Sequence, residues 1–148
     1  MKKFRFGLDS VLDYRRQLLD SCQSEYARAM DQVRRQEERK ADAEARYRSL
    51  NQGFREAAAV GITAADALTY EGGLRLLEQE IARETQRLEE YRRTAEEKRE
   101  KMVHAHIDKT VLERLREKKR QDYDKEVQKS EELFIDELVC AARSDPDE

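Results

Sequence analysis

The chain has 148 residues, of which 43% are charged and 38% hydrophobic, with five glycines, one proline and no tryptophan. A compact globular domain usually carries about 45–50% apolar and about 25% charged residues, so the composition excludes a large core. The 30 basic and 33 acidic residues give a net charge of −3, which gives no reason to expect nucleic acid binding, because that favours a clearly basic domain.

The sequence also bears on location. No apolar run approaches the roughly 18 residues that a membrane-spanning helix needs. Lys2, Lys3 and Arg5 are not followed by the apolar stretch of a secretory signal. The two cysteines, Cys22 and Cys140, lie far apart, and we expect them to remain reduced in the cytoplasm.

The first predicted helix runs from about residue 10 to about residue 54. Ser10 and Asp13 have the spacing of a capping box at its start, and Asn51, Gln52 and Gly53 lower helix propensity at its end. An apolar seam with a seven-residue period predicts a coiled-coil helix between them. Its two positions hold Leu12, Leu19, Tyr26, Val33, Lys40, Tyr47 and Phe54, and Arg15, Cys22, Ala29, Gln36, Ala43 and Leu50. The polar members predict a partner helix with complementary polar groups.

Residues 55–63 are predicted to connect this helix to a second one, with Gly61 supplying a positive φ at the reversal. Thr63 and Asp66 form another capping-box spacing, and the second helix is expected over about 64–143. Its seam comprises Leu74, Ile81, Leu88, Ala95 and Met102, paired with Tyr70, Leu77, Tyr91, Ala105 and Leu112. After Leu112 the phase slips, and the apolar line moves to Leu115, Tyr123, Val127, Phe134, Leu138 and Ala141.

These elements predict an all-α fold over residues 1–148: two long helices in an antiparallel coiled-coil hairpin, with the second helix longer. The unequal lengths predict that about 30 residues at the end of the second helix extend past the start of the first. Such a segment carries apolar surface that seldom stays bare, so we expect it to bind a partner. We expect residues 144–148 to form a frayed end.

The sequence offers no catalytic chemistry. His104 and His106 lie on different faces of a helix with no third ligand nearby, and no nucleotide loop, Ser/His/Asp group or Cys-x-x-Cys motif occurs. We therefore expect no enzyme activity, metal, cofactor or small-molecule ligand. A basic run of Arg114, Arg116 and residues 118–120 is either a solvated face or a contact for an acidic protein surface, with nucleic acid a distant third.

The opening residues Phe4, Phe6 and Leu8 alternate with polar ones. They either pack on the first turns of the helix as a staple or present an exposed apolar hook to a partner.

Several motifs, taken in order, resemble the bacterial flagellar export protein FliJ family. The first is Phe4-x-Phe6-x-Leu8-x-x-Val11-Leu12-x-x-Arg15. The second comprises Gly61-Ile62-x-Ala64, Tyr70 and Leu77-Glu78-x-x-Ile81. The third is the segment from Leu112 to Val139 with Asp136-Glu137-Leu138. The resemblance covers nearly the whole chain and implies a non-enzymatic stalk of the type III export ATPase.

By this resemblance the partners are the hexameric export ATPase FliI, the export gate FlhA and export chaperones, with the chain peripheral to the inner membrane through them. The end built from residues 1–20 and 112–143 would enter the ATPase ring. The ATPase-binding residues implied are Phe4, Phe6, Leu8, Val11, Leu12, Arg15, Leu115, Arg116, Tyr123, Phe134 and Leu138. The gate-binding residues implied are Gly73, Leu77, Glu80 and Glu84. Only Leu77 keeps the family's residue type there, since Gly73 replaces an aromatic residue and Glu80 a small one.

Three alternatives remain open from the residues. The chain could be the equivalent stalk of a virulence-type secretion system, a chaperone-like holdase for export substrates, or a purely structural coiled coil that homodimerises through the projecting segment.

Overall fold

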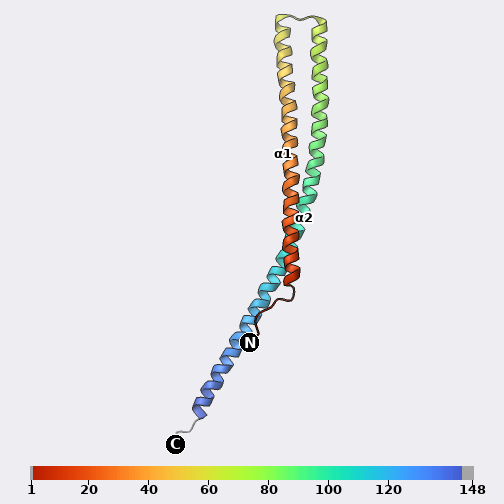
Figure 1. Cartoon of the computed structure of the whole chain (residues 1–148). Coiled ribbons are helices and arrows are strands. Elements are labelled where there is room, and N and C mark those ends of the chain that lie inside the picture. Colours follow the sequence, from red (N-terminus) through yellow and green to blue (C-terminus); the bar gives the residue numbers. More distant parts are fainter. Residues whose placement is uncertain (1, 145–148) are drawn as a thin grey trace. The chain divides into compact units, whose positions relative to one another are not determined.

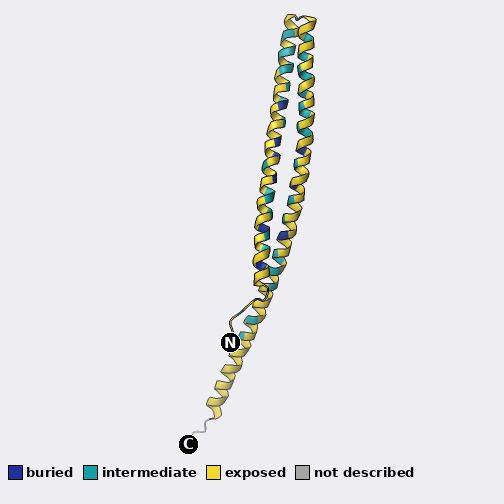
Figure 2. Ribbon diagram, turned by 45° about the vertical axis from the view of Figure 1, so that its right-hand side comes forward, coloured by how far each residue is buried: buried dark blue, intermediate teal, exposed yellow. Residues whose placement is uncertain are grey.

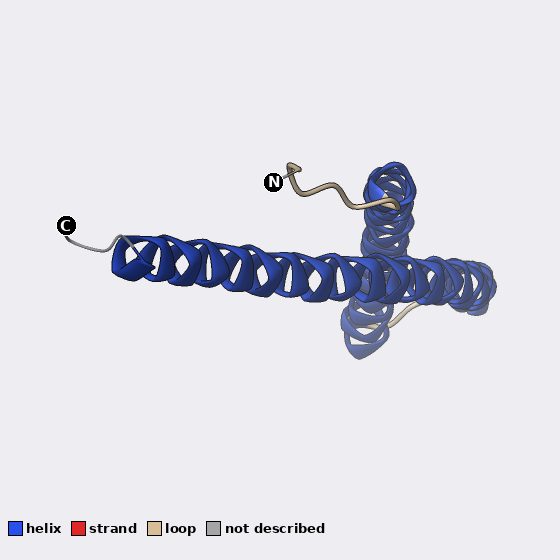
Figure 3. Cartoon of the chain, turned by 90° about the horizontal axis from the view of Figure 1, so that it is seen from below, coloured by secondary structure: helices blue, strands red, loops and turns tan. Residues whose placement is uncertain are grey.

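The computed structural model describes residues 2–144, which form two long α-helices, an N-terminal arm and a short connection (Figure 1). Helix α1 spans Asp9–Val60 and helix α2 spans Ala64–Ser144. Helix and loop are the only secondary structure in this part of the chain (Figure 3). The predicted all-α hairpin with a longer second helix is therefore confirmed. The end expected to fray, residues 145–148, lies outside the described residues.

Helix α1 continues six residues beyond the end predicted near Phe54, so the connection is residues 61–63 rather than 55–63. Gly53 costs a helix about 1 kcal/mol relative to alanine. Leu50, Phe54 and Ala57 are half-buried, and the Phe54 and Tyr70 rings lie 5.2 Å apart. Burial of these side chains outweighs the weak local propensity, because packing on a neighbouring helix supplies most helical stability in proteins.

The reversal uses the two signals that the sequence predicted for it. Gly61 has a φ of 108°, and its N–H donates to the Ala57 carbonyl at 3.0 Å, which is the αL form of helix termination. Thr63 then caps α2, because its Oγ1 accepts a hydrogen bond from the Asp66 N–H at 3.1 Å.

Helix α1 starts within one residue of the predicted position, but the predicted cap differs. The helix begins at Asp9, and Ser10 already lies within it. The first turn is closed by backbone bonds instead: the Asp9 N–H donates to the Phe6 carbonyl at 3.2 Å and the Leu12 N–H to the Leu8 carbonyl at 2.8 Å. The carbonyl of Leu8, in the N-terminal arm (residues 2–8), therefore accepts from the Leu12 N–H, a donor that the predicted Ser10 cap could have served.

Contacts divide the described chain into two units, and each is treated by itself. Unit 2 is residues 20–103, and unit 1 combines residues 2–19 with residues 104–144. The seam predicted from the heptads lies along the facing sides of the helices in both (Figure 2). Its core in unit 2 is Ala29, Val33, Leu88 and Ala95, with Tyr91 packed against them.

Of the polar seam residues in unit 2, Gln36 meets the complementary group on the partner helix that the sequence predicted, whereas Lys40 pairs with Glu44 of its own helix. Gln36 is 1% exposed, and its Nε2 donates to the Glu84 backbone carbonyl at 3.0 Å and to the Glu84 carboxylate. At the seam's edge, the Lys98 ammonium pairs with Glu25 at 3.2 Å. These bonds satisfy groups that an apolar seam would otherwise leave unpaired.

Candidate interaction surfaces

The N-terminal arm packs on α2 within unit 1. Phe6 is 7% exposed and is counted in the core, while the Phe4 ring lies 5.6 Å from the Tyr123 ring. The Tyr123 hydroxyl donates to the Lys2 carbonyl at 2.5 Å. The arm is therefore neither the predicted staple on the first turns of the first helix nor an exposed hook, because it packs on α2 instead, with Leu8 left exposed.

Two arginines hold Phe4 from the α2 side. The guanidinium carbons of Arg116 and Arg120 lie 5.8 and 5.2 Å from the centre of the Phe4 ring. Exposed cation–π contacts of this kind contribute about 0.5–1 kcal/mol each. Part of the predicted basic run is thus used to fix the arm, a role that the sequence did not indicate.

Beyond Val127, every described residue of α2 is exposed (Figure 2). The sequence predicted about 30 residues of the second helix beyond the start of the first, and residues 117–144 follow Arg116, which pairs with Asp9 at that start. The arm packs on the first part of this stretch, at Tyr123, so the uncovered segment is residues 128–144. Its exposed large apolar side chains are Leu133, Phe134, Ile135, Leu138 and Val139. Phe134 is 61% exposed and Leu138 54%. Neither described helix holds an apolar window long enough to cross a bilayer.

The residues implied for ATPase binding fall into distinct environments. Leu8, at the end of the arm, and Val11, in the first turn of α1, are exposed, and Leu115 is half-buried on α2. Leu12, at 1% exposed, lies inside the seam, where a partner cannot reach it. Arg15 is bonded to Asp108 at 3.3 Å.

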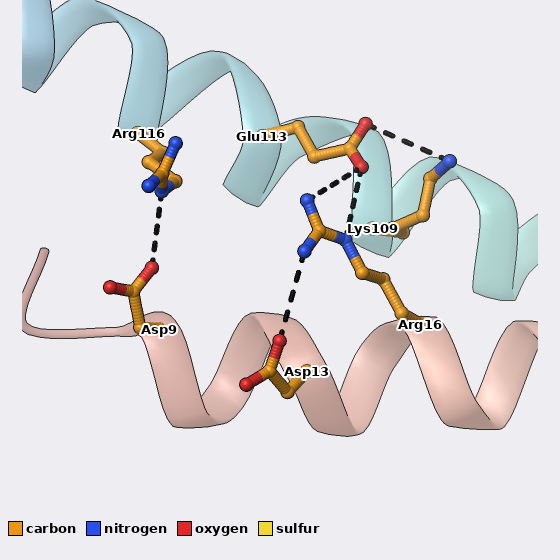
Figure 4. Close-up of polar contacts among 6 residues, drawn as sticks. All are labelled: Asp9, Asp13, Arg16, Lys109, Glu113 and Arg116. Atoms are coloured by element: carbon orange, nitrogen blue, oxygen red, sulfur yellow. Dashed lines mark hydrogen bonds and ion pairs between the residues drawn. The ribbon is translucent and has the colours of Figure 1, made fainter.

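Figure 4 shows a group of ion pairs in unit 1 that joins α1 to α2. Asp9, Asp13 and Arg16 follow one another at i, i+4 and i+7 on α1, and Lys109, Glu113 and Arg116 do so on α2. Arg116 Nε lies 3.1 Å from Asp9 Oδ1, and Arg16 Nε lies 3.4 Å from Glu113 Oε1. Each helix also holds an ion pair of its own. Lys109 Nζ lies 3.7 Å from Glu113 Oε2, and Arg16 Nη1 lies 3.7 Å from Asp13 Oδ1. The pairing of these two helix faces could not be predicted from the sequence, because the register between the helices was unknown.

The residues implied for gate binding lie in unit 2, along the side of α2 that faces α1. A Cβ added to Gly73 would come within 2.9 Å of Leu50 Cδ2. Leu77 is half-buried in the seam. Glu84 bonds Gln36, as described above. Their role in gate binding stays a prediction.

Glu80, the remaining gate-binding candidate, is also engaged within the hairpin. Its Oε1 accepts a hydrogen bond from Arg46 Nη2 at 2.5 Å. This hydrogen bond and the charge of Glu80 raise the pKa of Arg46. The pair is exposed to solvent, so its contribution to stability is small.

Within residues 2–144, the structure is an all-helical coiled-coil hairpin. The surfaces that a partner could reach are exposed helix faces and the uncovered segment of α2. The chain belongs to the flagellar FliJ protein family, whose model matches residues 4–144. It is thereby a component of the flagellar protein export apparatus. Searches of the curated proteins and of the solved structures found no match.

Proposed function

We propose that this protein is a non-enzymatic stalk of the flagellar export apparatus, which binds the hexameric export ATPase FliI through unit 1 and the uncovered segment of α2. The observation that carries the proposal is the row of exposed apolar side chains from Leu133 to Val139. Apolar surface of this kind typically marks an interaction site. Family membership supports the choice of export apparatus as its setting.

The proposed mechanism is allosteric. A ligand shifts a conformational equilibrium only by binding one state better than another. Subunits assembled in a ring around the stalk all contact it together, whereas separate subunits lack these contacts. The stalk therefore binds the assembled ring better than the separate subunits, and so it favours assembly. Because the faces of unit 1 differ in chemistry, different ring subunits meet different side chains and the coupling is unequal around the ring.

The export gate FlhA is the second partner that we propose, contacted along the early part of α2, with export chaperones also binding the chain. Leu76 supports this contact, because it is an exposed large apolar residue of this part of α2, and such surface often marks an interaction site. Through these partners the chain would associate peripherally with the inner membrane.

Titration of the purified chain into purified FliI tests the proposal. We expect the fraction of hexamer, measured by sedimentation, and the rate of ATP hydrolysis to rise together and saturate. If neither quantity changes although the chain is folded by circular dichroism, the proposal is wrong.

A holdase for unfolded export substrates is the second candidate, and the same exposed row favours it. A holdase would suppress the aggregation of an unfolded client and leave ATP hydrolysis by FliI unchanged. A stalk would instead raise ATP hydrolysis by FliI and leave the aggregation of the client unchanged.

A further inference from the structure

Helix α2 has an exposed, mostly apolar face in unit 2, on the side away from α1. Tyr70 lies on the α1 side, because its ring is 5.2 Å from the Phe54 ring. At 3.6 residues per turn, Leu68 and Leu76 face away from that side, and they are 68% and 67% exposed. We call this side the outer face of α2 and define it by six exposed residues without charge: Ala65, Leu68, Thr69, Gly72, Leu76 and Gln79.

Gly72 lies at the centre of the outer face, and the packing of residues 2–144 does not require a glycine there. Its backbone is helical, and a Cβ added to it would meet no atom within 4 Å. Glycine is among the poorest helix formers, so it weakens α2 without improving any contact inside the hairpin. A glycine does allow another backbone to approach closely. Its position therefore favours a second helix that crosses α2 at Gly72.

The outer face is complementary to itself about Gly72. Leu68 and Leu76 lie equally far before and after Gly72 in the sequence. If two α2 helices cross antiparallel at Gly72, the Leu68 of each copy therefore lies level with the Leu76 of the other. Glu71 and Arg75 are exposed along one flank of the same face. In the antiparallel pair this flank meets its own copy, so each Glu71 carboxylate borders the Arg75 guanidinium of the other chain.

We infer that the outer face is an interface between two copies of this chain, which pair antiparallel through α2 with their Gly72 residues at the crossing. This goes beyond the proposed function. The face extends over roughly 21 Å at 1.5 Å per residue, which is short for a stable interface. The dimer is therefore weak and forms at micromolar or higher concentrations. Arg83, the next residue along the face, lies level with Gly61 of the second copy, before its α2 begins, so no helix covers the Arg83 charge.

Sedimentation equilibrium of the whole chain over a range of concentrations tests this interface. We expect Glu71→Arg and Arg75→Glu each to weaken self-association by about fivefold or more, because each places like charges across the pair. The two substitutions in one chain rebuild the ion pair with reversed sign, so self-association should return to within about twofold of the original. Glu89→Arg and Arg93→Glu are the matched controls. These exposed residues of α2 have the same spacing, and their substitution should leave self-association unchanged.

Gly72→Ala gives a second readout. A Cβ at the crossing keeps the two helices apart, so we expect self-association to weaken by about tenfold. The same substitution should raise the thermal midpoint of the chain, measured at a concentration where the chain is monomeric, because alanine is the better helix former. A substitution that only disturbed the fold would lower both quantities.

Three results would overturn the inference. The first is a chain that stays monomeric at the highest concentrations reached. The second is a dimer that neither Glu71→Arg nor Gly72→Ala weakens, because another surface would then hold it. The third is a monomeric chain whose Leu68→Asp/Leu76→Asp variant loses binding to FlhA, which would assign the outer face to the export gate alone. Activation of FliI is measured separately, so the dimer and the proposed function can fail independently.

Discussion

Gln36 occupies a position in the seam that would usually be apolar. Its Nε2 is bonded to Glu84, but its Oε1 is buried without a hydrogen-bond partner. A buried acceptor without a partner costs about 1–3 kcal/mol. A buried polar residue in a coiled coil can nevertheless fix the register of the helices, and this gives a physical reason for its presence.

We therefore expect Gln36→Leu to raise the free energy of unfolding by about 1 kcal/mol, since it removes the unpaired oxygen and adds apolar burial. Urea denaturation followed by circular dichroism measures this change. Gln17→Leu, at an exposed position of α1, serves as the control and should leave stability unchanged. A clear loss of stability in Gln36→Leu would show that its bonds to Glu84 outweigh the cost of the unpaired oxygen.

Gly72 and Gly73 are neighbours in α2 that differ only in their surroundings. Replacing a helical glycine with alanine stabilises a helix by about 1 kcal/mol. A Cβ on Gly72 meets no atom within 4 Å, whereas one on Gly73 meets Leu50 Cδ2 at 2.9 Å. We expect Gly72→Ala to stabilise the protein by about 0.5–1 kcal/mol. Gly73→Ala should gain less, because Leu50 must move. Thermal unfolding of the two variants compares them, and equal gains would mean that Leu50 moves at no cost.

At the scale of elements, the connection between the helices depends on one backbone conformation. Gly61 has a φ of 108°, a conformation that residues with a Cβ rarely adopt. We expect Gly61→Ala to destabilise the hairpin by about 1 kcal/mol. Gly53→Ala, within α1 and with open space around a Cβ, should instead stabilise it. The denaturant midpoints of the Gly61→Ala and Gly53→Ala variants test this expectation. A shift of the same sign in both variants would contradict the role given to Gly61.

The N-terminal arm is short, yet it contributes to the stability of unit 1 by packing on α2. Phe6 is buried and Phe4 stacks on Tyr123, so Phe6→Ala should expose the stretch of α2 around residues 115–127. Replacing a buried phenylalanine with alanine costs about 3–5 kcal/mol in a full core, and we expect a smaller loss at this half-open site. Hydrogen exchange resolved along the chain should rise in residues 115–127 and stay unchanged in unit 2. Unchanged exchange in both would show that the arm does not protect α2.

The sequence predicted the helices and their seam well, because heptad periodicity reports directly which side of a helix is covered. Every first-helix seam residue from Leu12 to Phe54 is buried or half-buried. The end of α1 could not be predicted, because the low local propensity around Gly53 is overridden by the packing of Phe54 on Tyr70. The arm was also ambiguous, since its contact with Tyr123 joins residues that are remote in sequence.

At the scale of the whole chain, the sequence predicted which segment of α2 is uncovered but not how the N-terminal arm covers the stretch before it, because the contact of Phe4 with Tyr123 joins residues remote in sequence. Leu12, which the resemblance implies for ATPase binding, also lies in the seam predicted from the heptads, and its burial agrees with the seam.

The central claim is that the uncovered end of α2 binds the export ATPase. The most direct measurement is the activation of FliI by the double variant Phe134→Asp/Leu138→Asp, compared with Leu68→Asp/Leu76→Asp, which alters exposed leucines of unit 2. All four positions are exposed, so both variants should fold and unfold as the unaltered chain does. We predict that the first double variant loses the stimulation of ATP hydrolysis and the second retains it. Full stimulation by Phe134→Asp/Leu138→Asp would contradict the account.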